Sequence, residues 1–156
     1  GPYLYSRQMV VVKEESDIQT LQDLKGKRVA VQATTKAENL FLHNIESELP
    51  QMGQVNCFSS PTEIYSALRK NYVDAIAGHE AMLGSLVKDS KGAYRMLKES
   101  PYKSELGIAF QKGTHEEVAE ELTETLKEMQ NDGLTKEIVT KYGLDADEIL
   151  PGGESK

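Results

Sequence analysis

The feature that most constrains the fold is a strand pattern followed by a helix pattern, repeated three times in the middle of the chain. Short apolar runs at residues 29–31, 55–58 and 73–77 have the character of buried strands. Each run is followed by apolar residues spaced by threes and fours, which is typical of an amphipathic helix. This alternation predicts an α/β fold with a small, mainly parallel sheet, right-handed crossovers and helices on both faces.

The first of these strand-to-helix junctions is Ala33-Thr34-Thr35. Thr35 and Glu38 stand three apart, as in a capping box, and predict a helix that continues to about Leu49. The free N–H groups and the positive dipole end of that helix would face the strand's carboxyl end, which is a suitable place for a carboxylate or phosphate. A simple N-cap in a βα turn would explain the same residues.

Ligands of such sheets bind at the carboxyl ends of the strands, so we expect a site where residues 33–35 and 78–80 meet. Two more capping boxes are predicted, at Ser60 with Glu63 and at Thr114 with Glu117. The helix after Thr114 carries an apolar stripe, formed by Val118, Leu122, Leu126 and Met129. A β-run is expected at residues 106–110, before this helix, and a second short helix, 136–142, after it.

The composition narrows the classes of function. The net charge is −7, which disfavours nucleic-acid binding, and 38% hydrophobic residues suffice for a core. No apolar run is long enough to span a bilayer. The single Cys57 excludes an internal disulfide without deciding the compartment, and the three histidines lack the neighbours of a metal site. We expect no cofactor and no metal.

Four segments resemble family 3 extracellular solute-binding proteins, the amino-acid-type receptors of bacterial ABC importers. The segments are Leu21-Gln-Asp-Leu-Lys-Gly-Lys-Arg-Val-Ala-Val-Gln, Tyr72-Val-Asp-Ala-Ile-Ala, Leu106-Gly-Ile-Ala-Phe-Gln-Lys-Gly and Leu126-Lys-Glu-Met-Gln-Asn-Asp-Gly-Leu-Thr-Lys-Glu-Ile-Val-Thr-Lys-Tyr-Gly. They follow one another in the family's order over nearly the whole chain. The resemblance implies the second lobe of a type II periplasmic-binding-protein fold, followed by C-terminal helices.

The resemblance also implies a division of the chain. Residues 1–8 would be the first crossover between lobes, 9–105 the second lobe, 106–143 the returning crossover with the C-terminal helices, and 144–156 a flexible tail. Most of the first lobe, which in the family supplies an arginine and aromatic rings to the ligand, would then be missing. The apolar stripe would face that missing lobe, so the helices are expected either to fold back onto the chain's own sheet or to form a homodimer.

By resemblance, Thr35 stands where the family binds the ligand's carboxylate through a hydroxyl and an N–H group. Thr34 replaces the usual glycine before it, and Lys36 follows it as a cation that would favour an acid. The family's acid for an α-ammonium falls at His79, with Glu80 next to it. Either Glu80 binds the ammonium after a one-residue slip, or the ligand is not an α-amino acid.

Other residues near these motifs have plainer interpretations. Asp74 is interpreted as structural, at the start of a strand. Tyr3 and Tyr5 line the hinge or simply pack on the surface.

Three functions are therefore considered. The first is a lobe of an extracytoplasmic solute-binding protein, periplasmic or a cell-surface lipoprotein, that delivers an amino acid or similar small polar carboxylate to an ABC permease. The second is the same fold as the extracellular sensor of a membrane receptor with a downstream signalling domain. The third, an enzyme, is disfavoured because no acid–base pair converges on one pocket.

Overall fold

The computed structural model describes residues 1–152 and divides into two compact units. The larger unit comprises residues 7–103, and the smaller one comprises residues 1–6 together with the chain from residue 104 onward. The division expected from the sequence placed the second lobe at 9–105.

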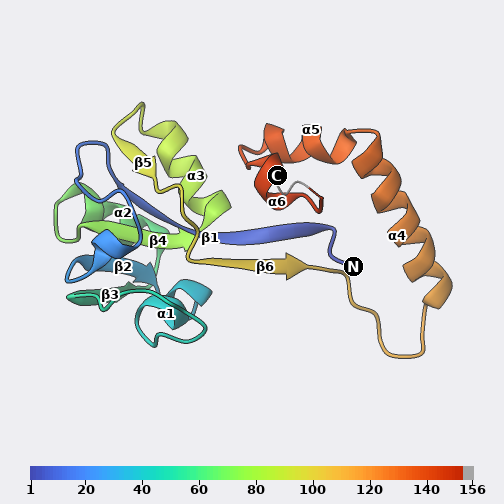
Figure 1. The fold of residues 1–156 in the computed structure, drawn as a ribbon, viewed down its shortest axis with the longest axis horizontal. Coiled ribbons are helices and arrows are strands. Elements are labelled where there is room, and N and C mark those ends of the chain that lie inside the picture. The colour runs from blue at the N-terminus through green and yellow to red at the C-terminus, as the bar shows by residue number, and fades with distance from the viewer. Residues whose placement is uncertain (153–156) are drawn as a thin grey trace. The chain divides into compact units, whose positions relative to one another are not determined.

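The strands form one mixed sheet (Figure 1). Its order is β3-β2-β4-β1-β5, and β6 pairs with β1 outside this path. β2 runs parallel to β3 and β4, whereas β1 runs antiparallel to β4 and β5. The predicted α/β class is confirmed, and the parallel part is the region where strand and helix patterns alternate. The bounds are β1 Leu4–Lys13, β2 Arg28–Gln32, β3 Gln54–Phe58, β4 Ala75–His79, β5 Tyr94–Met96 and β6 Tyr102–Leu106.

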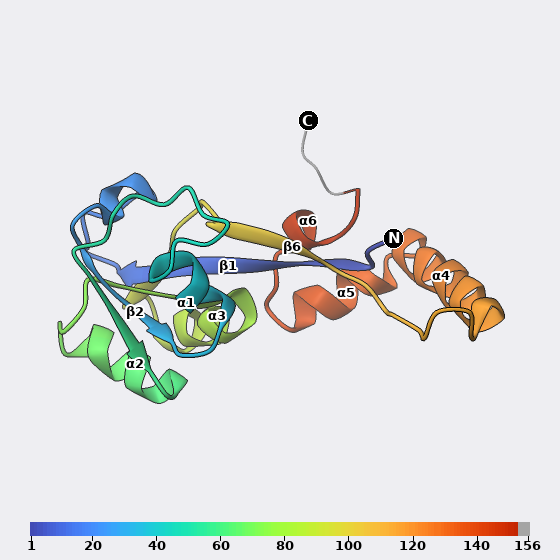
Figure 2. The ribbon, with the colours of Figure 1, turned by 90° about the horizontal axis from the view of Figure 1, so that it is seen from below.

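Helices cover both faces of the sheet, as predicted. Alternate residues of the central strands point to opposite faces, so Val10 and Val29 join one core whereas Val11 and Ala30 join the other. The first core includes the short helices η1 (Gln22–Leu24) and α1 (Lys36–Phe41). The second includes α2 (Pro61–Arg69) and α3 (Glu80–Asp89), which lie together on one side of the sheet in Figure 2.

The capping box predicted at Ser60 is confirmed. The Ser60 hydroxyl accepts the N–H of Glu63 at 3.4 Å, and the Glu63 carboxylate accepts the N–H of Ser60 at 3.0 Å. Pro61 follows at the first helical position, where no N–H is needed. These contacts begin α2 at the residue that the sequence indicated.

The helix predicted to run from Thr35 to about Leu49 is wrong in length. α1 ends at Phe41, because Asn44 and Glu46 adopt left-handed backbone conformations with φ of 52° and 54°. A helix cannot continue through such residues. The apolar spacing that suggested a longer helix includes Ile45, whose side chain is instead 51% exposed.

The smaller unit holds α4 (Glu116–Asn131), α5 (Leu134–Lys141) and α6 (Ala146–Ile149). The flexible tail expected from residue 144 is not found over residues 146–149, and residues 153–156 lie outside the described part. The Asp145 carboxylate accepts the N–H of Asp147 at 3.2 Å and begins α6. Ile149 is then buried against a small core that includes Val139 and Leu4.

Two further expectations for this region are wrong. The β-run predicted at residues 106–110 is displaced, since β6 ends at Leu106. The capping box at Thr114 is absent, because its hydroxyl donates to the carbonyl of Gln111 at 2.8 Å and His115 becomes the N-cap of α4. His115 has a left-handed φ of 56°, which turns the chain before the helix begins.

No residue of α4 is buried, and its apolar stripe includes Val118 at 50% exposure. Among residues 1–152, no helix combines the length and the apolar content that crossing a membrane requires.

Candidate ligand-binding site

The strand ends that were predicted to form the site do meet at one edge of the sheet. β2 and β4 are parallel neighbours, with Val29 opposite Ala75 and Ala30 opposite Ile76. Residues 33–36, which follow β2, and residues 79–80, which end β4 and begin α3, therefore share the carboxyl edge of the larger unit.

The turn after β2 is built differently from the capping box that was expected. Thr34 has a left-handed φ of 61°, and its N–H donates to the Glu38 carboxylate at 2.7 Å. The Thr35 hydroxyl does not cap α1 but donates to the carbonyl of Gln32 at 2.7 Å. Thr34 is exposed and Thr35 is half-buried, so this turn faces solvent. The N–H groups at the start of α1 have no intrahelical acceptor.

Lys36 is the cation of this edge, and it is held in place by two side chains. Its ammonium pairs with the Glu46 carboxylate and lies 4.0 Å from the centroid of the Tyr102 ring. The hydrogen bond with Glu46 raises the pKa of the Lys36 amine above its ordinary value, so this amine stays charged at neutral pH. The sequence did not indicate either partner, because Glu46 lies in an irregular loop and Tyr102 is distant along the chain.

Glu80 is engaged by an arginine that the sequence did not single out. Arg7 donates from Nε to one carboxylate oxygen of Glu80 at 2.9 Å and from Nη2 to the other at 2.6 Å. Both residues are buried, at 7% and 5% exposure. The register explains the pair, because Gln8 stands opposite His79 in the antiparallel ladder and Arg7 is therefore opposite Glu80. The pair of Arg7 and Glu80 could be predicted only from the direction of β1, which the sequence did not determine.

His79 caps the helix that Glu80 begins. Its Nδ1 accepts the N–H of Ala81 at 3.2 Å, and the residue is exposed. With Nδ1 acting as an acceptor, the neutral imidazole carries its proton on Nε2. His79 therefore lies at the same edge as Thr35 and Lys36, where it caps α3.

Asp74 belongs to the opposite end of β4, as its structural interpretation implied. Its carboxylate binds the guanidinium and the backbone N–H of Arg28, at the start of β2. Of the two tyrosines considered for the hinge, Tyr3 lies in the smaller unit, where its N–H donates to the carbonyl of Leu106 at 2.9 Å.

The larger unit has a cavity of about 650 Å³ that none of the predicted site residues lines. Glu46, the partner of Lys36, is one of its lining residues. Three of its lining residues are acids, and the full set is Leu21, Gln22, Glu46, Ser47, Glu48, Leu49, Glu99, Ser100 and Pro101.

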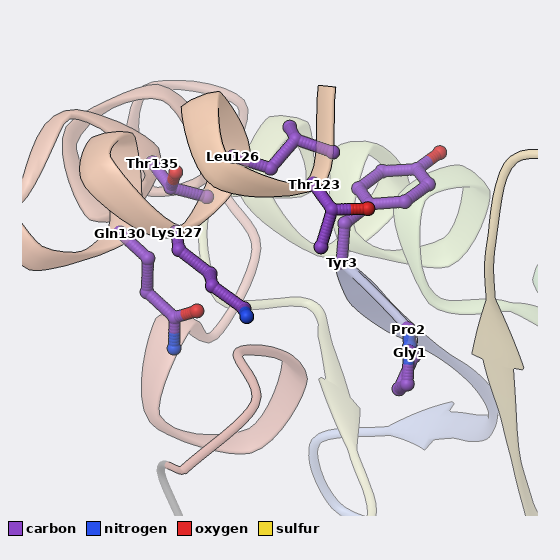
Figure 3. Close-up of a pocket in the computed structure, with 8 residues that line it drawn as sticks. All are labelled: Gly1, Pro2, Tyr3, Thr123, Leu126, Lys127, Gln130 and Thr135. Atoms are coloured by element: carbon purple, nitrogen blue, oxygen red, sulfur yellow. The ribbon is translucent and has the colours of Figure 1, made fainter. Parts of the chain in front are cut away.

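A small cavity in the other unit contains none of the predicted residues. Its volume is about 100 Å³, below the several hundred Å³ usual for a ligand pocket. Figure 3 shows Thr123, Leu126, Lys127 and Gln130 of α4 among the residues that line it, together with Tyr3. We therefore place the candidate site at the carboxyl edge of the larger unit.

The chain is similar to curated binding proteins over nearly all its length. It is 29% identical over 143 residues to the L-cystine-binding protein TcyJ of Escherichia coli, covering 90% of this chain and 52% of TcyJ. It is 30% identical over 143 residues to the ABC transporter glutamine-binding protein GlnH of Bacillus subtilis, covering 90% of this chain and 49% of GlnH. The chain thus spans about half the length of the curated relatives it matches.

Solved structures give the same result for the fold. An ancestral arginine-binding protein bound to glutamine superposes with a TM-score of 0.62 at 30% identity, covering 91% of this chain and 61% of that one. An ancestral cationic amino acid solute binding protein, at 24% identity, has a TM-score of 0.75 and covers 92% of this chain and 60% of that one. The expected periplasmic-binding-protein fold is therefore confirmed.

A family model adds the last comparison. It is described as "ABC transporter, phosphonate, periplasmic substrate-binding protein" and matches residues 4–148. Because this match includes both units and nearly all of the described residues, the chain belongs to that family of periplasmic substrate-binding proteins.

Proposed function

We propose that the chain is a ligand-binding lobe of an extracytoplasmic solute-binding protein for an amino acid or a similar small polar carboxylate. The observation that carries the proposal is the meeting of residues 33–36 and 79–80 at the carboxyl edge of a parallel strand pair. Relatives named for cystine and glutamine support the class of solute, and the family description names phosphonate. All three solutes carry an acidic group, which is the chemistry that this edge can bind.

Each predicted residue has a role in this proposal. A solute carboxylate binds the N–H groups of Thr35 and Lys36, and the Thr35 hydroxyl turns from the Gln32 carbonyl to donate to it, while the Lys36 ammonium attracts it. The carboxylate of Glu38 already occupies the N–H of Thr34 and marks the place where an acid fits. His79 and Glu80 lie at the neighbouring strand end, where His79 caps α3 and Glu80 is bound by Arg7.

The finer assignments are also proposals. We place the chain in the family 3, amino-acid-receptor branch, with a first lobe that completes the site and an ABC permease that receives the solute. The location is then the periplasm or the outer face of the cell membrane. The names of the relatives are those of binding proteins, which supports a role without catalysis and gives no preference to a signalling receptor.

Calorimetry on the two-lobed protein tests this proposal, with glutamine, arginine and cystine as titrants. Thr35→Ala should weaken binding by roughly 1–2 kcal/mol, about five- to thirtyfold, through loss of a hydroxyl beside the carboxylate. Thr114→Ala is the matched control, since its hydroxyl also donates to the carbonyl three residues earlier but lies in the other unit. Equal losses in the two variants, or no binding of any titrant, would contradict the proposed site.

The chain by itself should bind these solutes only at millimolar concentration. A lobe holds part of the contacts, and water reaches the hydrogen bonds that remain. Micromolar binding by residues 1–156 alone would place the site elsewhere.

A further inference from the structure

The free edge of β3 differs in charge from the rest of the chain. β3 is the last strand on one side of the sheet, so in the described part of the chain one of its edges has no neighbouring strand (Figure 1). It lies within residues 49–62, the longest run without an acidic or basic residue in a chain with 28% charged residues. The strands at the other side of the sheet, β5 and β6, carry Arg95, Lys103 and Glu105. Charged side chains hinder the pairing of an edge strand with another chain, and β3 lacks this protection.

Two residues of β3 direct their backbone groups away from the sheet. The carbonyl of Phe58 accepts the N–H of Ala33 at 2.9 Å, so Phe58 bonds toward the β2 side. Successive residues of a strand direct their backbone groups to opposite sides, so Val55 and Cys57 point outward. No described residue pairs with the outward groups of these two residues, and Cys57 is exposed.

Asn56, which lies between these two residues, has a side-chain oxygen that the described fold leaves unsatisfied. Its Oδ1 is buried and has no hydrogen-bond partner among residues 1–152. A buried polar atom without a partner is unfavourable, and native proteins retain few of them. The χ2 angle of asparagine is broad and roughly two-fold, so the amide can turn toward a strand that pairs with β3. Because an amide both donates and accepts, a second asparagine amide would satisfy it.

We propose that β3 is an interface between two copies of this chain, in which the free edges of two β3 strands pair antiparallel and join two sheets into one. With Asn56 at the two-fold axis, Val55 of each copy lies opposite Cys57 of the other. The outward backbone groups of these residues then exchange both N–H···O bonds of each pair, as in any antiparallel ladder. The two Asn56 residues face each other between these pairs, where opposite Cα atoms approach to about 4.5 Å. The assembly is closed, because both copies use the same edge.

The charge of the chain favours this edge over other surfaces for self-association. Two copies that each carry a net charge of −7 repel each other, and they repel least where neither presents a charged group. A cavity of about 490 Å³ begins beside Gln54 and Val55, and the described residues that line it are all uncharged. Glu38 interacts with the Cys57 thiol, but it also accepts the N–H of Thr34, which partly balances its charge.

Sedimentation velocity on the full chain tests the proposal, under reducing conditions and in the background Val118→Glu/Leu122→Glu. This background disrupts association through α4, so a dimer that remains uses another interface. We expect the background chain to dimerise as its concentration rises over a hundredfold range. Cys57→Pro should raise the dissociation constant at least tenfold, because it removes an outward N–H that the native sheet does not use. Cys57→Ser keeps this N–H and is the matched control, which should stay within threefold.

Two results of this experiment would overturn the proposal. One is a background chain that stays monomeric over the whole range. The other is a folded Cys57→Pro variant that dimerises as well as Cys57→Ser, since another surface would then be responsible.

Hydrogen exchange on the background chain is a measurement that does not depend on the proline variant. The N–H groups of Val55 and Cys57 should exchange at least tenfold more slowly at high concentration than at low concentration. The N–H of Asn56, which bonds toward β2, should be protected at both concentrations. Equal rates for Val55 and Cys57 at the two concentrations would contradict the proposal even if Cys57→Pro fails to fold.

An engineered disulfide tests the register. Val55→Cys places a cysteine opposite Cys57 of the second copy, where the Cα atoms are about 5.5 Å apart and within reach of a disulfide. Mild oxidation should therefore give a covalent dimer. In Val55→Cys/Cys57→Ser the remaining cysteines lie on a diagonal, and the yield should fall at least tenfold. Equal yields from the two variants would rule out antiparallel pairing centred on Asn56.

Discussion

Arg28 and Asp74 are joined by four hydrogen bonds at the amino ends of two neighbouring parallel strands. The guanidinium donates from Nε at 3.1 Å and from Nη2 at 2.8 Å, and the backbone N–H of Arg28 donates to the same carboxylate at 2.9 Å. The backbone N–H of Asp74 returns a bond to the carbonyl of Arg28 at 2.8 Å. This cluster fixes the register of β2 against β4, at the end opposite the candidate site.

The pair makes the free energy of unfolding depend on pH in the acid range. The hydrogen bond from Arg28 is the main cause of the lowered pKa of Asp74. A carboxyl whose pKa is lower in the folded state stabilises the protein above its unfolded pKa, and this contribution is lost as the pH falls through the folded pKa. We therefore expect Asp74→Asn to flatten the fall in stability below about pH 4.

Urea midpoints between about pH 2 and pH 6 measure this effect. The side chains are 44% and 33% exposed, so the contribution at neutral pH should be about 1 kcal/mol. Asp89→Asn removes a carboxylate elsewhere in the same unit and serves as control. Acid profiles of equal steepness for Asp74→Asn and the wild type would contradict the prediction.

The capping box of α2 offers a second prediction. Ser60→Ala should lower the free energy of unfolding by about 1 kcal/mol, because it removes the acceptor for the N–H of Glu63. Ser59→Ala alters the exposed neighbouring residue and should change stability by less than about 0.5 kcal/mol. Chemical unfolding of both variants decides the point, and identical midpoints would show that the hydroxyl does not stabilise the helix.

The buried pair of Arg7 and Glu80 gives a third prediction. Glu80→Gln should destabilise by roughly 3–5 kcal/mol, because it removes the bidentate carboxylate from a buried ion pair. Arg7→Met/Glu80→Leu should lose less than the sum of its two single changes, with a coupling of about 1–3 kcal/mol. Strict additivity in this cycle would mean that the two side chains do not stabilise each other.

The exposed pair of Lys136 and Asp147 is the matched control for burial. Its atoms are 3.1 Å apart, but the side chains are 61% and 74% exposed. Asp147→Asn should therefore cost less than about 1 kcal/mol in the same assay.

The fourth prediction concerns the apolar stripe of α4. The same unit exposes other large apolar side chains, among them Ile108 at 53% and Ile138 at 40%. Such a surface promotes association, so the isolated chain should dimerise as its concentration rises. Sedimentation velocity over a hundredfold range of concentration measures this.

Two variants separate the stripe from a general charge effect. Val118→Glu/Leu122→Glu should shift the chain toward monomer, whereas Glu120→Gln/Glu124→Gln on the polar face should not. A chain that stays monomeric at every concentration would remove the homodimer from consideration.

The parts of the fold that followed from the sequence are those decided by local chemistry. The periodicity of residues 28–89 identified the three strand–helix units, and Ser60 with Glu63 identified the start of α2 at the correct residue. The two threonine capping boxes failed for a common reason. A left-handed residue, Thr34 or His115, turns the backbone just before the helix, and each threonine hydroxyl then donates backward to a carbonyl.

The partners of the site residues could not be obtained in this way. Arg7 meets Glu80 only because β1 runs antiparallel to β4, and the direction of a strand is not encoded in its own hydrophobic run. Tyr102 and Glu46 meet Lys36 from a strand and a loop whose positions depend on the whole sheet. The positions at the edge were predictable from topology, but their charge balance required the tertiary structure.

The place of β1 in the sheet has a consequence for how the chain folds during synthesis. β1 leaves the ribosome before its neighbours in the sheet, β4 and β5, which end at His79 and Met96. Its run of buried valines must remain unpaired until most of the larger unit has been made, and closing so long a loop slows folding. Nascent chains that end before about residue 96 therefore expose an aggregation-prone strand, and these are the chains that a chaperone must protect.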